Sequence, residues 1–185
     1  MKFIYLILFF IYSTTASAQL LKWSKDTLLT WNDFKVFVDT GKFEAISYLS
    51  MTYEYRYSVI DGVYKAKFKI SHTFDPSKST TIVSKQTSYL LKHEQTHFDI
   101  AEYFARQLRF ELESYTYTKN IKDEIIKIYK RVDGEREKMQ NLYDSQSKNG
   151  RDVNLKKKWE DFVANLLIKN YPLDELLRPG MVPNG

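Results

Sequence analysis

The stretch Leu90-Leu91-Lys92-His93-Glu94-Gln95-Thr96-His97-Phe98-Asp99-Ile100-Ala101-Glu102 contains a complete HExxH motif. In an α-helix, residues four positions apart lie on the same face, so His93 and His97 can bind one metal ion together. Glu94 lies beside them, where its carboxylate can take a proton from a metal-activated water and later pass it to a leaving amine. The motif therefore predicts a metal site, with His93 and His97 as ligands and Glu94 as the general base.

The residues around the motif predict one long helix from about Gln86 to Tyr115. Apolar residues continue the helical period on both sides of the motif, and no proline or glycine interrupts it. Both motif histidines fall on this apolar stripe, although the whole sequence contains only three histidines. We therefore expect them to face the core, and a chance match on a solvated helix is the less favoured interpretation.

The chain after the motif predicts a second helix, from about Ile121 to Asp144, on another apolar stripe. A polar, β-prone break separates the two helices, so we expect them to form an antiparallel hairpin. With the turn centred near Thr118, residues equidistant from it face one another, which brings His93 close to Tyr143. The end of the second helix therefore returns to the predicted metal site.

A catalytic zinc ion usually takes three protein ligands and leaves one position open, so a third ligand is required. Asp144 is our prediction for it, because this residue lies at the level of His93 in the expected hairpin. Two other candidates are Glu135, within the apolar stripe of the second helix, and His72, on the apolar face of a predicted strand. Asp99 is interpreted as a hydrogen-bond acceptor behind a ligand histidine, or as a surface charge.

Upstream of the motif, the sequence predicts two antiparallel strands. They run from Ala45 to Tyr57 and from Val63 to Phe74, and they are joined by a turn at Asp61-Gly62. The second strand places apolar residues and His72 on one face and lysines on the other. We expect the apolar face to cover the helices. A third amphipathic helix, from Val153 to about Asn170, should pack against the helical hairpin.

Residues 1–18 have the pattern of a secretory signal peptide. A lysine precedes a short apolar run, and Ala16-Ser17-Ala18 is a small-x-small cleavage signal. The run is too short to span a membrane, so we expect a periplasmic or extracellular protein with no stable membrane insertion after cleavage. The remaining residues, 19–185, are expected to form one domain. The sequence has no cysteine, and therefore no disulfide is expected.

The charge pattern bears on possible partners. The sequence has 28 basic and 23 acidic residues, and the basic residues form no long run. Nucleic-acid binding is therefore not expected. The sequence carries no signature of the oligomeric state.

The motif stretch and the upstream Leu29-Thr30-Trp31-Asn32-Asp33-Phe34 resemble the DUF922 family, bacterial secreted proteins described as predicted zinc-dependent proteases. The resemblance covers nearly all of the chain after residue 18. The family pattern continues with a Tyr-Asp pair, a Thr-x-His-Gly stretch and a later Gln-x-x-Trp. In register with that pattern the chain has Tyr143, Asp144, Gly150 and Trp159. It departs from the pattern at Asn149, which replaces the histidine, and at Lys156, which replaces the glutamine.

The departure at Asn149 affects the predicted site. The resemblance implies a histidine where the hairpin geometry requires a third ligand, and an amide oxygen is a poorer zinc ligand than imidazole or carboxylate. Either Asp144, Glu135 or His72 completes the site, or this chain binds metal weakly and has lost catalysis.

Together these patterns predict a small zincin-like α+β domain. A twisted antiparallel sheet would pack on a helical hairpin that carries HExxH, with a C-terminal helix added. The predicted function is that of a secreted zinc metallopeptidase acting on a peptide or protein substrate. The alternative is a catalytically lapsed, zincin-like binding module of the cell envelope. Hydrolysis of a non-peptide amide, such as one in cell-wall material, would use the same chemistry, and other divalent metals accept similar ligands.

Overall fold

The computed structural model describes residues 19–178 and 180–183. The predicted signal peptide, residues 1–18, lies outside the described residues. In the described part of the chain, none of the helices combines the length and the apolar character needed to cross a bilayer. The elements are β1 (Leu21–Lys22), η1 (Trp31–Asp33), β2 (Val36–Phe37), β3 (Ala45–Ile46), β4 (Leu49–Ile60), β5 (Val63–Phe74), β6 (Thr80–Thr81), η2 (Val83–Lys85), α1 (Ser88–Ser114), α2 (Ile121–Ser147), α3 (Val153–Lys169) and α4 (Leu173–Leu176).

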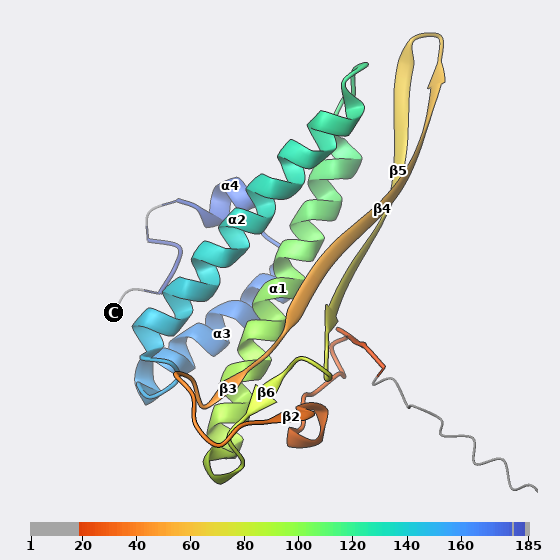
Figure 1. Ribbon diagram of the computed structural model, residues 1–185. Coiled ribbons are helices and arrows are strands. Elements are labelled where there is room, and N and C mark those ends of the chain that lie inside the picture. The colour runs from red at the N-terminus through yellow and green to blue at the C-terminus, as the bar shows by residue number, and fades with distance from the viewer. Residues whose placement is uncertain (1–18, 179, 184–185) are drawn as a thin grey trace, which may run out of the picture.

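Strands β4 and β5 form the long hairpin that the sequence predicts. Their register runs from the pair Leu49–Phe74 to the pair Ile60–Val63, and β1 adds a short third strand to β5. The turn residues Asp61 and Gly62 have φ values of 51° and 76°. Two consecutive positive φ values are typical of a type I′ turn, whose twist matches that of the flanking strands. Figure 1 shows the hairpin running alongside α1, with its turn at the same end of the molecule as the α1–α2 loop.

The predicted strand from Ala45 to Tyr57 is wrong in one respect, because the chain breaks between β3 and β4. At the break, the backbone N–H of Ser47 donates to Glu94 and that of Tyr48 donates to Ser79 Oγ, so side chains take the place of a strand partner. Strand β3 then joins a second sheet of order β2-β6-β3, in which β2 is parallel and β3 antiparallel to β6. Strands of two residues are too short to show a periodic pattern in sequence.

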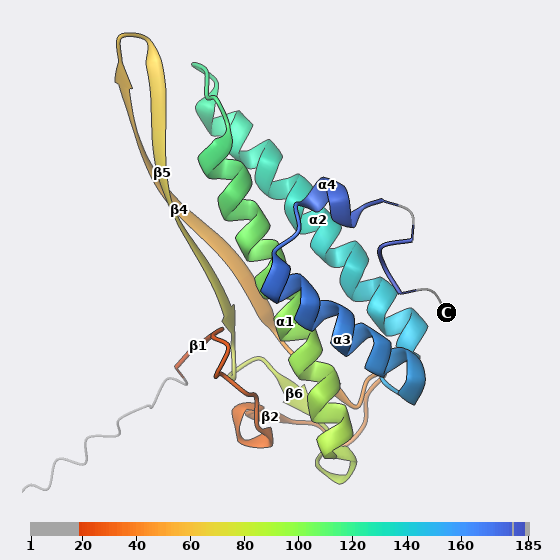
Figure 2. The same cartoon turned by 180° about the vertical axis from the view of Figure 1, so that it is seen from behind.

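Helices α1 and α2 form the predicted antiparallel hairpin. Helix α1 begins after Thr87, whose Oγ1 accepts a hydrogen bond from Leu90 N at 3.0 Å. Helix α3 begins after Asp152, whose Oδ1 accepts from Leu155 N at 3.1 Å. Seen from behind, α3 crosses α1 and α2 on the side away from the β4–β5 hairpin (Figure 2). The main core therefore lies between the hairpin of strands, the hairpin of helices and α3.

A second apolar cluster lies at the end of the molecule where α1 begins. It joins the N-terminal segment to β5 and α1 through Phe34, Phe74 and Phe98, all of which are fully buried. Phe34 therefore packs the N-terminal segment onto the rest of the domain. The cluster holds the first turns of α1, and with them the HExxH motif, against the small sheet.

Candidate metal centre

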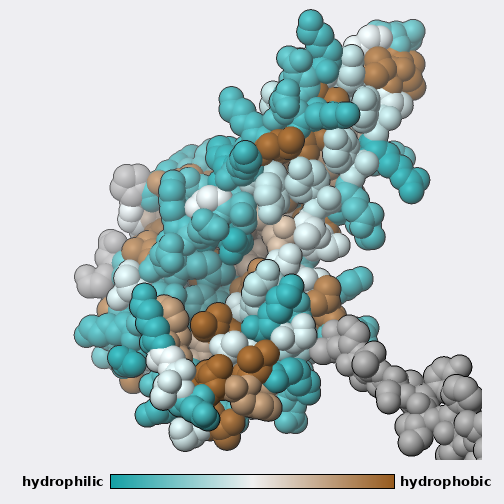
Figure 3. Space-filling view, in the orientation of Figure 1, coloured by the Kyte–Doolittle hydropathy of each residue, from teal (hydrophilic) through white to brown (hydrophobic). Residues whose placement is uncertain are grey.

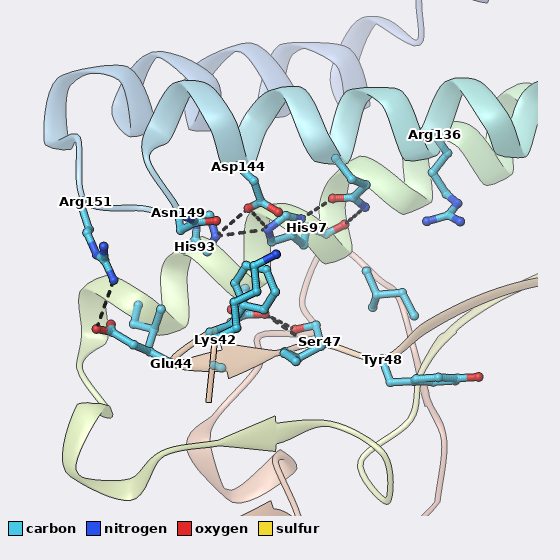
Figure 4. Close-up of a pocket in the computed structure, with 17 residues that line it drawn as sticks. Lys42, Glu44, Ser47, Tyr48, His93, His97, Arg136, Asp144, Asn149 and Arg151 are labelled. Carbon is cyan, nitrogen blue, oxygen red and sulfur yellow. Dashed lines mark hydrogen bonds and ion pairs between the residues drawn. The ribbon is translucent and has the colours of Figure 1, made fainter. Parts of the chain in front are cut away.

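The two motif histidines of α1 and Asp144 of α2 converge on one point (Figure 4). The Nε2 atoms of His97 and His93 lie 2.9 Å and 3.2 Å from Asp144 Oδ1, and 3.1 Å from each other. Around a tetrahedral ion with ligand bonds of about 2.0–2.1 Å, neighbouring ligand atoms are separated by roughly 3.3 Å. The three donor atoms already lie close to that separation, so these residues fit a bound divalent cation.

The structure separates the candidate third ligands. Glu135 forms an ion pair with Lys138 at 2.7 Å and does not line the pocket at the histidines. His72 is buried at the other side of α1, where its ring packs on Phe98. Asn149 does line the pocket, beside the histidines. Of the four residues considered, only Asp144 reaches both histidine Nε2 atoms.

Gln140 fixes the orientation of His97. Its Nε2 donates to the backbone carbonyl oxygen of His97 at 3.0 Å, and a carbonyl oxygen can only accept. The other end of the amide, Oε1, therefore faces His97 Nδ1, with which it forms a hydrogen bond. Because Oε1 is an acceptor, Nδ1 must carry the proton. This leaves Nε2 with the lone pair that a metal ligand needs.

Tyr143 holds His93 in a similar way. Its hydroxyl lies 2.9 Å from His93 Nδ1, and the two rings stack with a centroid distance of 4.7 Å. Tyr143 is itself fully buried against Trp159 of α3, whose Nε1 donates to Gln146. Helix α3 therefore supports the site indirectly. The residues behind both histidines are the kind that set tautomer and ring orientation in metal sites.

The charges at the site favour a cation. Burial lowers the pKa of His93, which keeps its imidazole neutral. Burial would also lower the pKa of His97, but the hydrogen bond and charge of Asp144 outweigh it and raise that pKa. Burial alone would raise the pKa of Asp144, whereas the two imidazoles next to its carboxylate hold that pKa well below its usual range. The ionised carboxylate thus draws positive charge into the space between the three residues.

Glu94 is held by Ser47, in the break between β3 and β4, rather than by a neighbour on its own helix. Its Oε2 accepts hydrogen bonds from the backbone N–H of Ser47 at 3.0 Å and from Ser47 Oγ at 2.6 Å. Within residues 19–178 and 180–183, Oε1 has no hydrogen-bond partner. The glutamate is only 3% exposed, yet it lines the same pocket as the three converging residues. One carboxylate oxygen is therefore fixed and the other is available for proton transfer.

The turn that follows α2 lies directly against His93. Three successive residues, Lys148, Asn149 and Gly150, have positive φ values of 53°, 55° and 80°. A side chain at Gly150 would place its Cβ 3.1–3.3 Å from atoms of the His93 side chain. The turn is tied down by Ser147, whose Oγ accepts from Gly150 N at 3.0 Å. Glycine at this position therefore lets the end of α2 approach His93 closely.

Gly150→Ala is expected to destabilise the protein by about 1–2 kcal/mol, because alanine disfavours the left-handed backbone region. It should also displace His93 and weaken metal binding. The matched control is Gly134→Ala, since Gly134 lies inside α2 with nothing near its missing Cβ. That variant should gain roughly 0.5–1 kcal/mol of stability. Denaturant unfolding of the metal-free variants measures the change in the free energy of unfolding for each. Equal stabilisation of the two variants would contradict the role given to Gly150.

The converging residues lie in a pocket of about 350 Å³. One wall is the segment from Lys42 to Leu49, which includes β3, and the other is formed by α1, α2 and the turn after α2. Strand β3 is at the edge of its sheet, with β6 on one side only. The backbone carbonyl oxygen of Glu44 accepts a hydrogen bond from Ile82 N, so the backbone polar groups of Glu44 point toward β6. In an antiparallel pair the next residue points the other way, so the backbone N–H and C=O of Ala45 are directed to the opposite side. The free edge of β3 therefore faces the pocket.

Sequence patterns missed two residues at the site and misplaced a third. Gln140 lies one helical turn before Asp144 on α2, and this spacing is the signal that could have identified it. Ser47 gives no signal, because it reaches Glu94 from a distant segment. Asp99 does not support a ligand histidine: its Oδ1 accepts from Trp23 Nε1 at 2.8 Å and from Gln95 Nε2 at 2.9 Å. It therefore anchors the N-terminal segment on the opposite side of α1.

Comparison of the chain with known proteins identifies the family to which it belongs. The model of a family described as "Bacterial protein of unknown function (DUF922)" matches residues 38–151, which is more than half of the chain and includes β3, the HExxH motif and Asp144. No curated protein and no solved structure matches the chain. The matched region, together with the convergence of its polar residues on one pocket, leads to a plain conclusion: the chain belongs to the DUF922 family.

Proposed function

We propose that this protein is a zinc-dependent peptidase with a zincin-like active site. The observation that carries the proposal is the triangle of His93, His97 and Asp144 donor atoms, 2.9–3.2 Å apart, with Glu94 in the same pocket. We further propose that residues 1–18 are removed on export to the periplasm or beyond, and that residues 19–185 form a single domain.

Two imidazoles and one carboxylate with an open fourth position form a ligand set typical of catalytic zinc, which is why zinc is the proposed ion. When bound, it would act as a Lewis acid toward a scissile carbonyl and lower the pKa of a water molecule. Ser47 holds Glu94 Oε2, so Oε1 is the atom that accepts the proton of the attacking water. Glu94 then delivers this proton to the leaving amine, as a general acid.

The proposed substrate is an extended peptide lying along the edge of β3. The Ala45 N–H and C=O are directed toward the pocket and can pair with a peptide backbone. Such pairing depends on the substrate backbone, so it gives affinity with little dependence on side chains. It also leads the peptide past Glu94, since Ser47, two residues after Ala45, is the residue that holds this carboxylate.

The proposal is tested by metal removal. The purified protein should contain about one zinc ion per chain by elemental mass spectrometry and should cleave a library of unstructured peptides. Treatment with a strong chelator should abolish cleavage, and added zinc should restore it. A protein that binds zinc but cleaves no peptide in the library would contradict the peptidase assignment while leaving the metal site intact.

The alternative function, a lapsed binding module of the cell envelope, is motivated by Asn149 in place of a family histidine. Two observations favour retained hydrolysis instead. Asp144 occupies the third position at ligand spacing, and Glu94 keeps its support from Ser47. A non-peptide amide substrate would use the same groups, and a protein that cleaves such an amide but no peptide would favour that reading.

A further inference from the structure

The turn end of the β4–β5 hairpin exposes aliphatic side chains to solvent. Val59, Ile60 and Val63, which we call the hairpin tip, are 48%, 59% and 54% exposed. They flank the two-residue turn at Asp61-Gly62. Figure 3 shows an apolar group at this protruding end of the molecule, separated from the other apolar areas. Exposed turns are usually polar, so three aliphatic residues here require an explanation.

Cationic side chains follow directly behind the hairpin tip. On the outer face of the sheet, the pair Ile60–Val63 is followed by Lys65 and then by the pair Arg56–Lys67. All three cationic residues are exposed. Within the described part of the chain, none of them forms an ion pair. The outer face is therefore apolar at its end and positively charged just behind it.

Tyrosines occupy the same level on the inner face. Tyr57 is 46% exposed and lies behind Val59 on the inner face of β4. The bridge between Tyr64 and Tyr117 holds the α1–α2 loop beside the hairpin. That loop adds Tyr115, which is 44% exposed, and the exposed Lys119. Behind the exposed turn residues Asp61 and Gly62, this end of the molecule thus presents aliphatic groups first, then tyrosine and lysine.

The order aliphatic, tyrosine, cation is the order of hydrocarbon, interface and phosphate in an anionic bilayer. At about 3.4 Å per residue, Lys65 lies roughly 7 Å behind Val63 along the strand. Apolar segments of peripheral proteins reach a depth of about 5–10 Å, so a tip inserted this far would bring Lys65 to the phosphates. We infer that the β4–β5 hairpin docks this protein on an anionic lipid bilayer.

Charge and shape both favour a bilayer over a protein partner. Residues 56–69 include four cationic residues and a single acidic one, Asp61, which complements an anionic surface. A stable protein interface uses about 20–30 residues on each side, whereas the hairpin tip is convex and offers three apolar side chains. The inference stands independently of the metal site, which lies at the opposite end of α1.

The test is co-sedimentation of the full chain with vesicles of phosphatidylcholine, with or without about 30% phosphatidylglycerol. Binding is expected only to the anionic vesicles, and it should weaken as salt is added. The triple variant Val59→Thr, Ile60→Thr, Val63→Thr should bind at least about ten-fold more weakly, because threonine keeps the strand preference but removes apolar surface. Its matched control is Val83→Thr, Val153→Thr, Ile168→Thr, whose exposed fractions are 59%, 64% and 80%.

Substitution of Lys65 and Lys67 by glutamine should weaken binding by about five-fold for each residue at low salt. All variants carry residues 1–18, so a difference in binding between them reports the substituted residues. Unchanged binding of the hairpin-tip variant would overturn the proposal. So would failure of the wild-type chain to bind either kind of vesicle, a result that would instead favour a protein contact for the tip.

Discussion

Glu94→Gln is expected to slow peptide hydrolysis by on the order of 1,000-fold, the contribution of a well-placed general base. The amide keeps the size of the side chain, and its oxygen can still accept from Ser47. It cannot take a proton from water, so kcat should fall while KM changes little. Zinc content should remain at the wild-type value, because Glu94 is not one of the three converging donors. Steady-state kinetics and elemental analysis of the same preparation measure both quantities.

The matched control for this variant is Glu113→Gln, the same substitution at an exposed position on the same helix. It should leave both kcat and zinc content unchanged. If Glu94→Gln lost its zinc, Glu94 would be a ligand or would hold the ligands, and its assignment as the base would be wrong. If hydrolysis survived with zinc retained, another group would have to accept the proton.

Asp144→Asn is expected to lower zinc affinity by at least about 100-fold. Loss of a residue behind a ligand costs about 10–100-fold, and here the ligand itself loses its charge. The neutral amide is also a weaker donor to zinc than a carboxylate. Competition with a chromophoric chelator gives the affinity directly. Peptide hydrolysis should fall in parallel at low zinc and recover in part when zinc is raised.

Two control variants separate Asp144 from the other candidates. Asn149→Gly removes the amide without straining the backbone, because glycine accepts the positive φ of 55° at this position. Glu135→Gln removes the carboxylate that pairs with Lys138. Both should keep wild-type zinc affinity. If Asp144→Asn retained zinc and Asn149→Gly lost it, the third zinc ligand would be Asn149 and not Asp144.

The parts of the site that depend on helix geometry could be predicted from sequence. The HExxH spacing places both histidines on one face, and the equal rise of two antiparallel helices brings residues equidistant from the turn together. The contact between His93 and Tyr143 confirms that calculation. Asp144 follows from it, because it is the next residue. Regular elements have fixed dimensions, so distant positions on them can be related.

The parts that depend on irregular chain could not be predicted. Ser47 reaches Glu94 because the chain leaves β3 and enters β4 at that point, and no local pattern marks the break. The second sheet consists of two-residue strands with no detectable period. Gln140 lies one helical turn before Asp144, which makes it a candidate, but the sequence does not show that its amide contacts the His97 carbonyl. In each case the decisive partner is far away in sequence.

The unbroken length of α1 determines how far the pocket lies from the end of the molecule that carries the hairpin tip. This one helix carries the HExxH motif near its start and continues without a break to Ser114 at the end where the hairpin tip lies. From His97 to Ser114 it spans about 26 Å. A molecule standing upright on a bilayer through that end would hold its pocket about this far from the lipid. A peptide bond fewer than about eight extended residues from the membrane anchor of a substrate would then not reach the pocket. The length of chain between the anchor and the cleaved bond would therefore determine which membrane-bound substrates are cut.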